Sequence, residues 1–234
     1  MKNFILAGLA TLFLVTGHSQ NNDDKNQQSR KASGFHGVQV SGGIDLYLSN
    51  GPESVSVSAA TTEIRDHMIT EVVNGILRIH LEQDWHLGLR NPRMKAYVSI
   101  QKLNDLDASG GSDVYLQNKI TGDDINMRLS GGSDLKGKLD ANHLVINQSG
   151  GSDVDLSGNV KNLEVDASGG SDLQGYDLVT DYASLHASGG CDSHLTVNKE
   201  LRIVASGGSD VSYKGAASVK EIKSSGSSSV TRKD

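Results

Sequence analysis

One five-residue phrase, Ser-Gly-Gly-Ser-Asp, recurs through the second half of the chain and limits what the chain can fold into. Complete copies stand at 109–113, 130–134, 149–153, 168–172 and 206–210. The copy at 188–192 has Cys191 in place of the second serine, and a degenerate copy occupies 225–229. The first serines of successive copies are 18 to 21 residues apart. A period of about 20 residues is typical of a solenoid, in which each repeat forms one coil and neighbouring coils share a core.

The residues around the motif alternate between apolar and polar, as the residues of half-buried strands do. The position three residues before the first serine is apolar in every copy, and its residues are Leu106, Met127, Ile146, Val165, Leu185, Ile203 and Ile222. Like residues therefore lie over like residues when coils stack at the strand spacing of about 4.8 Å. We expect an all-β fold, a parallel β-helix with coils of about 20 residues. A stack of β-hairpins or a β-prism is the alternative.

The chain divides into three parts. Residues 1–19 have the charge and the short apolar run of a signal peptide, and residues 20–32 form a polar lead-in that we expect to be flexible. Residues 33–234 form a single solenoid domain, with strands and an Asn74-Gly75 hairpin in 33–105 and the repeats in 106–234. We therefore expect an exported protein of the periplasm, the outer surface or the medium. No stretch after the signal predicts a transmembrane helix.

Charge and cysteine content narrow the classes of partner and site. The formal net charge of −6 disfavours nucleic acid as a partner. Cys191 is the only cysteine, so no intramolecular disulfide is possible. It replaces a serine at a position that we predict to face inward, where cysteine behaves as a small buried group.

The motif itself predicts a corner with an acidic outer row. Continuing the alternation from Val165 and Ala167 places Gly169 and Ser171 inside and Asp172 outside. The aspartates of the six copies then form one outward row: Asp113, Asp134, Asp153, Asp172, Asp192 and Asp210. We interpret the row first as structural, with each carboxylate bonded to the N–H groups of its own glycine corner. The alternative is a row of Ca²⁺ ligands, since Ca²⁺ prefers oxygen.

No arrangement of residues in the sequence predicts catalysis. The many serines include no Gly-x-Ser-x-Gly elbow with a partner histidine, and the carboxylates are too numerous for any one pair to stand out. We expect no enzyme activity and no cofactor other than the possible Ca²⁺. Aromatic residues that could stack on sugars show no clustering along the chain; they are Trp85, Tyr47, Tyr97, Tyr115, Tyr176, Tyr182 and Tyr213.

Several segments resemble a known family. They are Val38–Leu48, Val72–Ile79, Ala96–Ile100 and Leu103–Asp113. Together these segments resemble the head GIN domain of putative auto-transporter adhesins, over roughly residues 35–220. The resemblance implies a right-handed β-helix and an adhesin-like role, and it supplies no catalytic residues to carry over.

The sequence thus favours an exported, non-catalytic β-helix that binds an unidentified surface glycan or protein. Two alternatives remain open. One is a polysaccharide-active enzyme, which requires a groove with ordered carboxylates and a basic residue. The other is a structural protein of the cell envelope whose coils stack end to end, although the degenerate last copy and the charged residues after it count against open stacking.

Overall fold

The computed structural model describes residues 24–82, 85 and 92–234. The predicted signal peptide lies outside these residues. In chain order the elements are β1 (Gln28–Arg30), β2 (Gly37–Ser41), β3 (Asp45–Asn50), β4 (Ser54–Ser58), α1 (Thr62–Asp66), β5 (Met68–Val73), β6 (Ile76–Leu81), β7 (Lys95–Ile100), β8 (Asp105–Ser109), β9 (Val114–Leu116), β10 (Ile120–Leu129), β11 (Leu135–Gln148), β12 (Asp153–Gly169), β13 (Asp172–Gly189), β14 (Asp192–Ala205), β15 (Asp210–Lys214), β16 (Ser218–Ser224) and β17 (Ser229–Arg232).

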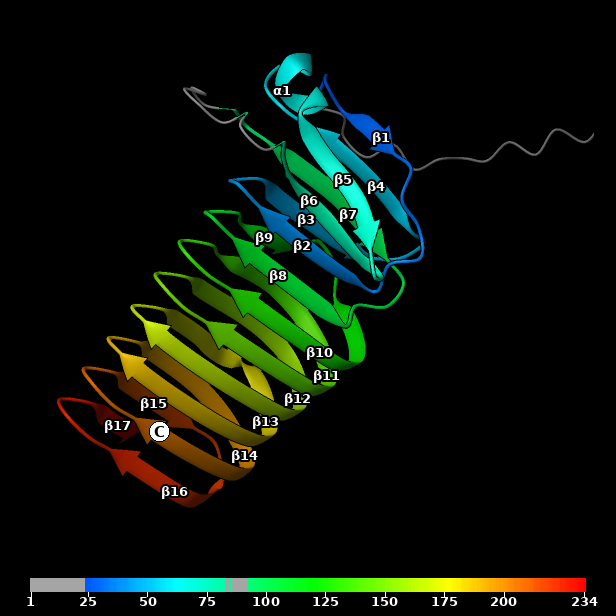
Figure 1. Cartoon of the computed structure of the whole chain (residues 1–234). Helices are drawn as coiled ribbons and strands as arrows, with labels where there is room; N and C mark the ends of the chain where they lie inside the picture. The colour runs from blue at the N-terminus through cyan, green and yellow to red at the C-terminus, as the bar shows by residue number, and fades with distance from the viewer. Residues whose placement is uncertain (1–23, 83–84, 86–91) are drawn as a thin grey trace, which may run out of the picture.

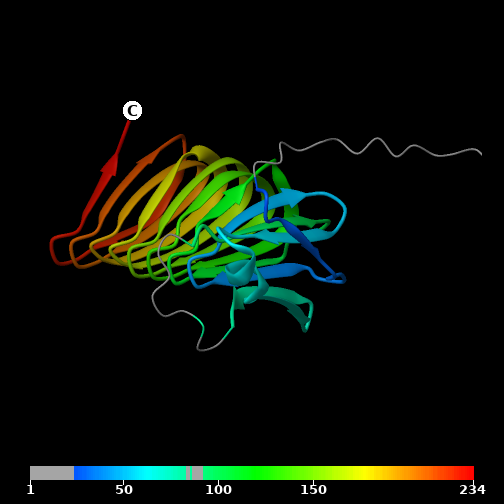
Figure 2. The same ribbon diagram turned by 90° about the horizontal axis from the view of Figure 1, so that it is seen from above.

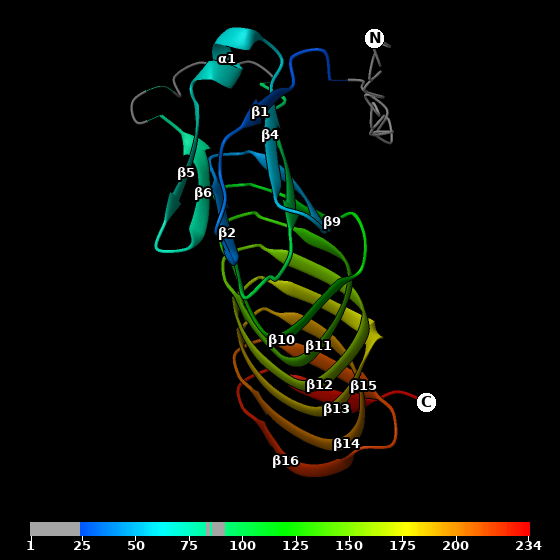
Figure 3. The ribbon, with the colours of Figure 1, turned by 90° about the vertical axis from the view of Figure 1, so that its right-hand side faces the viewer.

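The repeats form a β-solenoid whose coils pair in parallel (Figure 1). The parallel pairing runs from β8 through β10, β11, β12 and β13 to β14, and equivalent motif positions are partners, as in Asp153 opposite Asp172 and Val165 opposite Leu185. Figure 3 shows the same coils from the side, stacked from β10 to β16. The predicted β-solenoid is confirmed. Antiparallel pairs involve only β1, β4, β5, β6 and β7 among the described strands, so a stack of hairpins is wrong.

The core lies inside the coils and consists of the predicted apolar columns. Leu106, Met127, Ile146, Val165, Leu185 and Ile203 are all buried. Burying each such side chain stabilises the fold by about 1.5–3 kcal/mol. Ile222 belongs to the same column but is 43% exposed. It lies in β16, which pairs with β14 on one side only among the described strands, so no further coil covers it.

The glycine corner differs from the predicted one. Gly169 is exposed, not inward, because its φ of +82° turns the chain and interrupts the alternation, which resumes at buried Ser171. The N–H of Gly170 donates to the carbonyl of Gly150 in the preceding coil at 2.8 Å. A Cβ on Gly169 would lie 2.7 Å from that same carbonyl oxygen, whereas Gly170 has ordinary space around it. The degenerate copy agrees, since it keeps the first glycine and has Ser227 at the second position.

The inward serine of the motif is buried, as predicted, and so is Cys191. In the earlier copies Ser112 Oγ and Ser133 Oγ each accept from a backbone N–H of the preceding coil, whereas in later copies the polar atom closes its own corner. Ser209 Oγ donates to the carbonyl of Ser206 at 2.9 Å, and Cys191 Sγ does the same to Ser188 at 3.1 Å. Hydroxyl and thiol are therefore equivalent here, which explains the exchange of serine for cysteine.

The first coil of the stack comes from the N-terminal strands. β2 pairs in parallel with both β6 and β8, and β3 pairs in parallel with both β7 and β9. The coil made by β2 and β3 thus lies between strands that follow it in the chain. Its corner, Ser41-Gly42-Gly43-Ile44-Asp45, is a further copy of the motif, with Ser41 opposite Ser109. The stack therefore begins well before residue 106.

The remaining N-terminal elements lie at the end of the stack or beside it. The predicted hairpin is confirmed: β5 and β6 pair antiparallel around Asn74 and Gly75, whose φ angles are +53° and +77°. This hairpin projects from the side of the stack (Figure 2). The helix α1 begins after Thr61, whose side chain accepts from the N–H of Ile64.

Part of the predicted flexible lead-in is a strand. β1 pairs antiparallel with β4, and Gln27 Nε2 donates to Ser56 Oγ at 2.7 Å. The prediction failed for 28–30 because this segment has no apolar alternation to indicate a strand. It forms one because its backbone N–H and C=O groups pair with those at the edge of β4.

The two glycines of one corner should respond differently to the same substitution. Gly169→Ala places a Cβ at positive φ against the Gly150 carbonyl and disturbs the bond from Gly170, so we expect a loss of about 2–3 kcal/mol. Urea denaturation measures the change. Gly170→Ala is the matched control, and equal losses for both variants would contradict the account of the corner.

Candidate functional site

Each coil presents two outward surfaces, one on either side of the glycine corner. We call the aspartates that follow the corner the acidic row; they are Asp45, Asp113, Asp134, Asp153, Asp172, Asp192 and Asp210. Parallel pairing places Asp153, Asp172, Asp192 and Asp210 directly opposite one another. The six predicted aspartates thus form part of one row. Asp45 extends it and was missed, because Ile44 replaces the motif serine before it.

The carboxylates of the acidic row bond to the next coil and not to their own corner, which corrects the predicted Asx-type contact. Asp113 Oδ1 accepts from the N–H of Asp134, and Asp134 Oδ1 accepts from the N–H of Asp153, each at 3.3 Å. Asp172 and Asp192 repeat the arrangement. Each such bond offsets part of the repulsion between neighbouring charges.

Burial and repulsion along the acidic row raise the pKa of two of its carboxyl groups. Burial and the charges of Asp134 and Asp172 raise the pKa of the Asp153 carboxyl. Burial and Asp113 raise the pKa of Asp45, while Lys95 opposes the shift. Among the residues that the structure describes, no three His, Cys, Asp or Glu side chains converge as a metal site. The Ca²⁺ hypothesis for this row stays a prediction.

Removing one charge from the row should stabilise the protein. Asp153→Asn keeps the acceptor oxygen and relieves repulsion, so we expect up to about 1 kcal/mol of added stability at neutral pH, limited by solvent screening. Because the folded-state pKa of Asp153 is raised, the gain is full above that pKa and disappears below 3.8, where the native carboxyl is protonated in both states. Urea denaturation as a function of pH measures it.

Asp155→Asn is the control, since Asp155 lies two residues further on, opposite Lys136 and Gln174. This substitution removes an equal charge without relieving the repulsion between the carboxylates of the acidic row. A gain from Asp155→Asn as large as the gain from Asp153→Asn would contradict the assignment.

Calcium gives a second test of the acidic row. With one oxygen of several carboxylates bonded to the next coil, we expect millimolar Ca²⁺ to leave the melting temperature of the metal-stripped protein unchanged. Calorimetry with Ca²⁺ measures binding directly. Heat of binding together with a raised melting temperature would instead establish the row as a cation site.

Three tyrosines form a ladder that the sequence prediction missed. Tyr97, Tyr47 and Tyr115 stack in that order, with ring centroids 5.1 and 5.2 Å apart. The three residues are far apart in the sequence. They meet in the structure because β3 pairs with β7 on one side and with β9 on the other. Both faces of Tyr47 are covered by its neighbours, and Tyr97 donates its hydroxyl to Asp24. Burial, followed by Asp24, raises the pKa of Tyr97. The ladder therefore packs the coils together and leaves no face of Tyr47 for a ligand.

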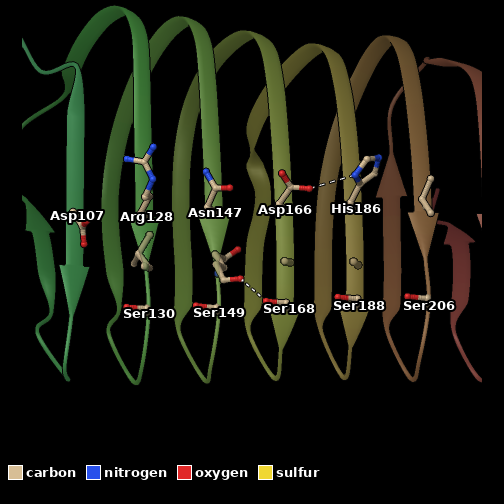
Figure 4. Close-up of a pocket in the computed structure, with 15 residues that line it drawn as sticks. Asp107, Arg128, Ser130, Asn147, Ser149, Asp166, Ser168, His186, Ser188 and Ser206 are labelled. Carbon is tan, nitrogen blue, oxygen red and sulfur yellow. Dashed lines mark hydrogen bonds and ion pairs between the residues drawn. The ribbon is translucent and has the colours of Figure 1, made fainter.

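On the other side of the corner lies an open groove of about 570 Å³ (Figure 4). Two rows of side chains line it, and we call it the serine groove. The serine row is the first serine of the motif: Ser130, Ser149, Ser168, Ser188 and Ser206. The mixed row lies two residues before the first serine of a motif copy: Asp107, Arg128, Asn147, Asp166, His186 and the apolar Val204. Parallel register aligns the mixed row from β8 to β13.

Acidic side chains of the mixed row each have a basic neighbour, which is always charged for Arg128 and charged for His186 only when its imidazole is protonated. His186 Nδ1 lies 3.3 Å from Asp166 Oδ1, and Asp107 is next to Arg128. Burial raises the pKa of the Asp107 carboxyl, while Arg128 opposes the shift. The sequence shows these residues as outward and polar, but their joint role depends on the register between coils.

The groove places a histidine, an aspartate and serines near one another without assembling a triad. His186 points toward Asp166, while Ser188 lies near the corner (Figure 4). In the described part of the chain, no hydroxyl is bonded to His186. The side chains of His186 and Asp166 are 63% and 52% exposed, whereas a triad aspartate is buried.

The carboxylates of the groove are also poorly placed for glycoside hydrolysis. Asp107 and Asp166 are three coils apart, which is about 14 Å at the strand spacing. Hydrolytic carboxylate pairs lie about 5–9.5 Å apart. Glu164 lies two residues before Asp166 on the same strand, about 6.6 Å away and so within that range, but both are exposed to solvent, whereas a general acid needs burial to raise its pKa.

A smaller pocket of about 180 Å³ lies beside the serine groove on the same strands. Its aromatic residue is Tyr182, which is 37% exposed and lies under the ammonium of Lys199, 5.6 Å from the ring centroid. Glu200 and Arg202 form its far side. This pocket combines an exposed aromatic ring with polar groups in a concave site on the outer surface.

Comparison with known proteins agrees with the fold. The family model described as "Putative auto-transporter adhesin, head GIN domain" matches residues 34–217. No curated protein matches the chain. In the described residues, no helix has the length and apolar character needed to cross a membrane.

Solved structures of low identity share the architecture. A putative adhesin from Bacteroides fragilis is 16% identical, with a TM-score of 0.82 over 88% of this chain and 95% of its own. A putative adhesin from Parabacteroides distasonis is 17% identical, with a TM-score of 0.66 over 88% and 95%. A putative lipid binding protein from the same species is 15% identical, with a TM-score of 0.67 over 89% and 96%.

Proposed function

The chain belongs to the family of the head GIN domain of putative auto-transporter adhesins, and on that premise we propose that it is an exported, non-catalytic β-solenoid that binds a surface glycan or protein through the serine groove. The observation that carries the proposal is the groove itself. It is concave and solvent-exposed, and rows of polar side chains from consecutive coils line it in register together with Leu129, Ala167, Ala187 and Val204.

The polar lining distinguishes among ligand classes. Serine hydroxyls, an amide and paired charges form hydrogen bonds, which suits a hydrated surface molecule. A lipid, the ligand class in the name of one structural neighbour, is disfavoured because burying the charged side chains of Asp107, Arg128 and Asp166 against apolar chains is costly, so we do not extend that name to this chain. The acidic balance of the chain disfavours nucleic acid.

Export is part of the proposal and rests on two supports. Residues 1–19 have the pattern of a signal peptide. The family description names adhesins, which act outside the cell.

A polysaccharide-active enzyme is the second candidate, because the groove does contain carboxylates, an arginine and a histidine. We rank it below binding because of the distance between Asp107 and Asp166 and the exposure of the Asp166–His186 pair. Release of reducing ends from a polysaccharide by the purified protein, lost on substitution of Asp166, would reverse the ranking.

Binding through the groove can be tested on arrays of glycans and extracellular matrix proteins. We expect the mature protein to bind a subset of spots, and Ser188→Trp to reduce that binding at least tenfold, since the indole occupies the exposed edge of the groove. Ser212→Trp, outward on the side of the acidic row, should leave binding unchanged. Absence of binding to every spot and to intact cells contradicts the proposal.

A further inference from the structure

We propose that the serine groove binds one linear, uncharged polysaccharide that lies along the solenoid axis, with about one sugar against each coil. This inference rests on the proposed binding function and names the ligand class for the same site. It follows from the repetition, the charge balance and the unused hydrogen-bonding groups of the groove.

The repetition of the groove matches a repeating ligand. The serine row and the mixed row run across the strands, so equivalent groups recur at the coil spacing of about 4.8 Å. A β-linked pyranose chain advances by a length close to this spacing with each ring. Each ring of such a chain therefore lies against one coil, and because successive β-1,4-linked rings are turned over, equivalent hydroxyls meet every second coil.

The repeat distance of an extended peptide does not match the spacing of equivalent groups along the serine groove. It advances about 3.3 Å per residue, so side chains on one face recur at about 6.6 Å. That period differs from the coil spacing by almost 2 Å, and a peptide lying along the axis loses register after a single coil. A polysaccharide is therefore favoured over a protein strand.

Charged side chains of both signs line the groove, which favours a neutral ligand over a strongly charged one. The positive charge of Arg128 lies beside Asp107, and His186 lies beside Asp166. A polyanion would meet both carboxylates as well as the acidic balance of the whole chain, while a polycation would meet the guanidinium. Hydroxyl groups, in contrast, can accept from the guanidinium and donate to the carboxylates.

Several polar groups of the groove are unused. Within the described chain, the Asn147 amide and the hydroxyls of Ser130, Ser149, Ser188 and Ser206 make no side-chain hydrogen bond, and Ser168 donates to the carbonyl of Gln148 at 3.3 Å. Asn147 lies at the centre of the mixed row, between Arg128 and Asp166 (Figure 4). Its amide can donate to one sugar hydroxyl and accept from another.

The absence of an aromatic side chain among the residues that line the groove predicts how affinity is built up. Without a stacking platform, each coil contributes only hydrogen bonds, each of about 0.5–1.5 kcal/mol. Affinity should therefore increase about threefold to tenfold per added sugar until the ligand spans the coils of the serine row. Short oligosaccharides should bind too weakly to detect.

The test uses the mature protein and labelled oligosaccharides of increasing length, followed by fluorescence anisotropy. The neutral probes are cello-, manno- and xylo-oligosaccharides, and the charged probe is oligogalacturonate. We expect at least one neutral series to bind with affinity that rises with length and then levels off. We expect Asn147→Ala to weaken the longest probe about fivefold or more, and Ser212→Ala to leave it unchanged.

The results separate this inference from the proposed function. Binding to surface arrays without binding to any neutral series overturns the inference and leaves the proposed function standing. Preference for oligogalacturonate, affinity independent of length, or full affinity in Asn147→Ala also overturns it. Absence of binding to arrays and to all oligosaccharides contradicts both.

Discussion

The structure depends on the hydrogen bond between the glycine corners of successive coils. The N–H of Gly170 reaches the carbonyl of Gly150 because Gly169 adopts positive φ and has no Cβ to separate the two corners. The same bond recurs from Gly151 to Gly131 and from Gly190 to Gly169. It sets the register of neighbouring coils at the point where the chain turns most sharply.

Register at the corner determines what each face presents. On one side it aligns the acidic row, whose carboxylates bond to the amide of the next coil and partly compensate their own repulsion. On the other side it aligns the serine row and the mixed row and creates the groove. Structure and proposed function thus have one origin, because residues about 20 positions apart become neighbours only when the corners stack.

Much of this could be predicted from the sequence. The spacing of the motif predicted a β-solenoid, and the alternation predicted the buried columns, the inward serine and Cys191. The parts that failed depend on non-local order. Ile44 concealed one copy of the motif, and the placement of β3 between β7 and β9 concealed the tyrosine ladder. The positive φ at Gly169 interrupts the in-and-out alternation, so a strict period of two wrongly placed this glycine inside. The groove could not be predicted from the sequence, because the rows that line it are aligned only by the pairing register between coils.

The most direct test of the central claim is a crystal structure of the protein with a long neutral oligosaccharide bound. The account predicts one chain lying along the serine groove from β10 to β14, perpendicular to the strands, with successive sugars against successive coils and with Asn147 in contact. A ligand bound along the acidic row, or lying parallel to the strands across a single coil, would contradict it.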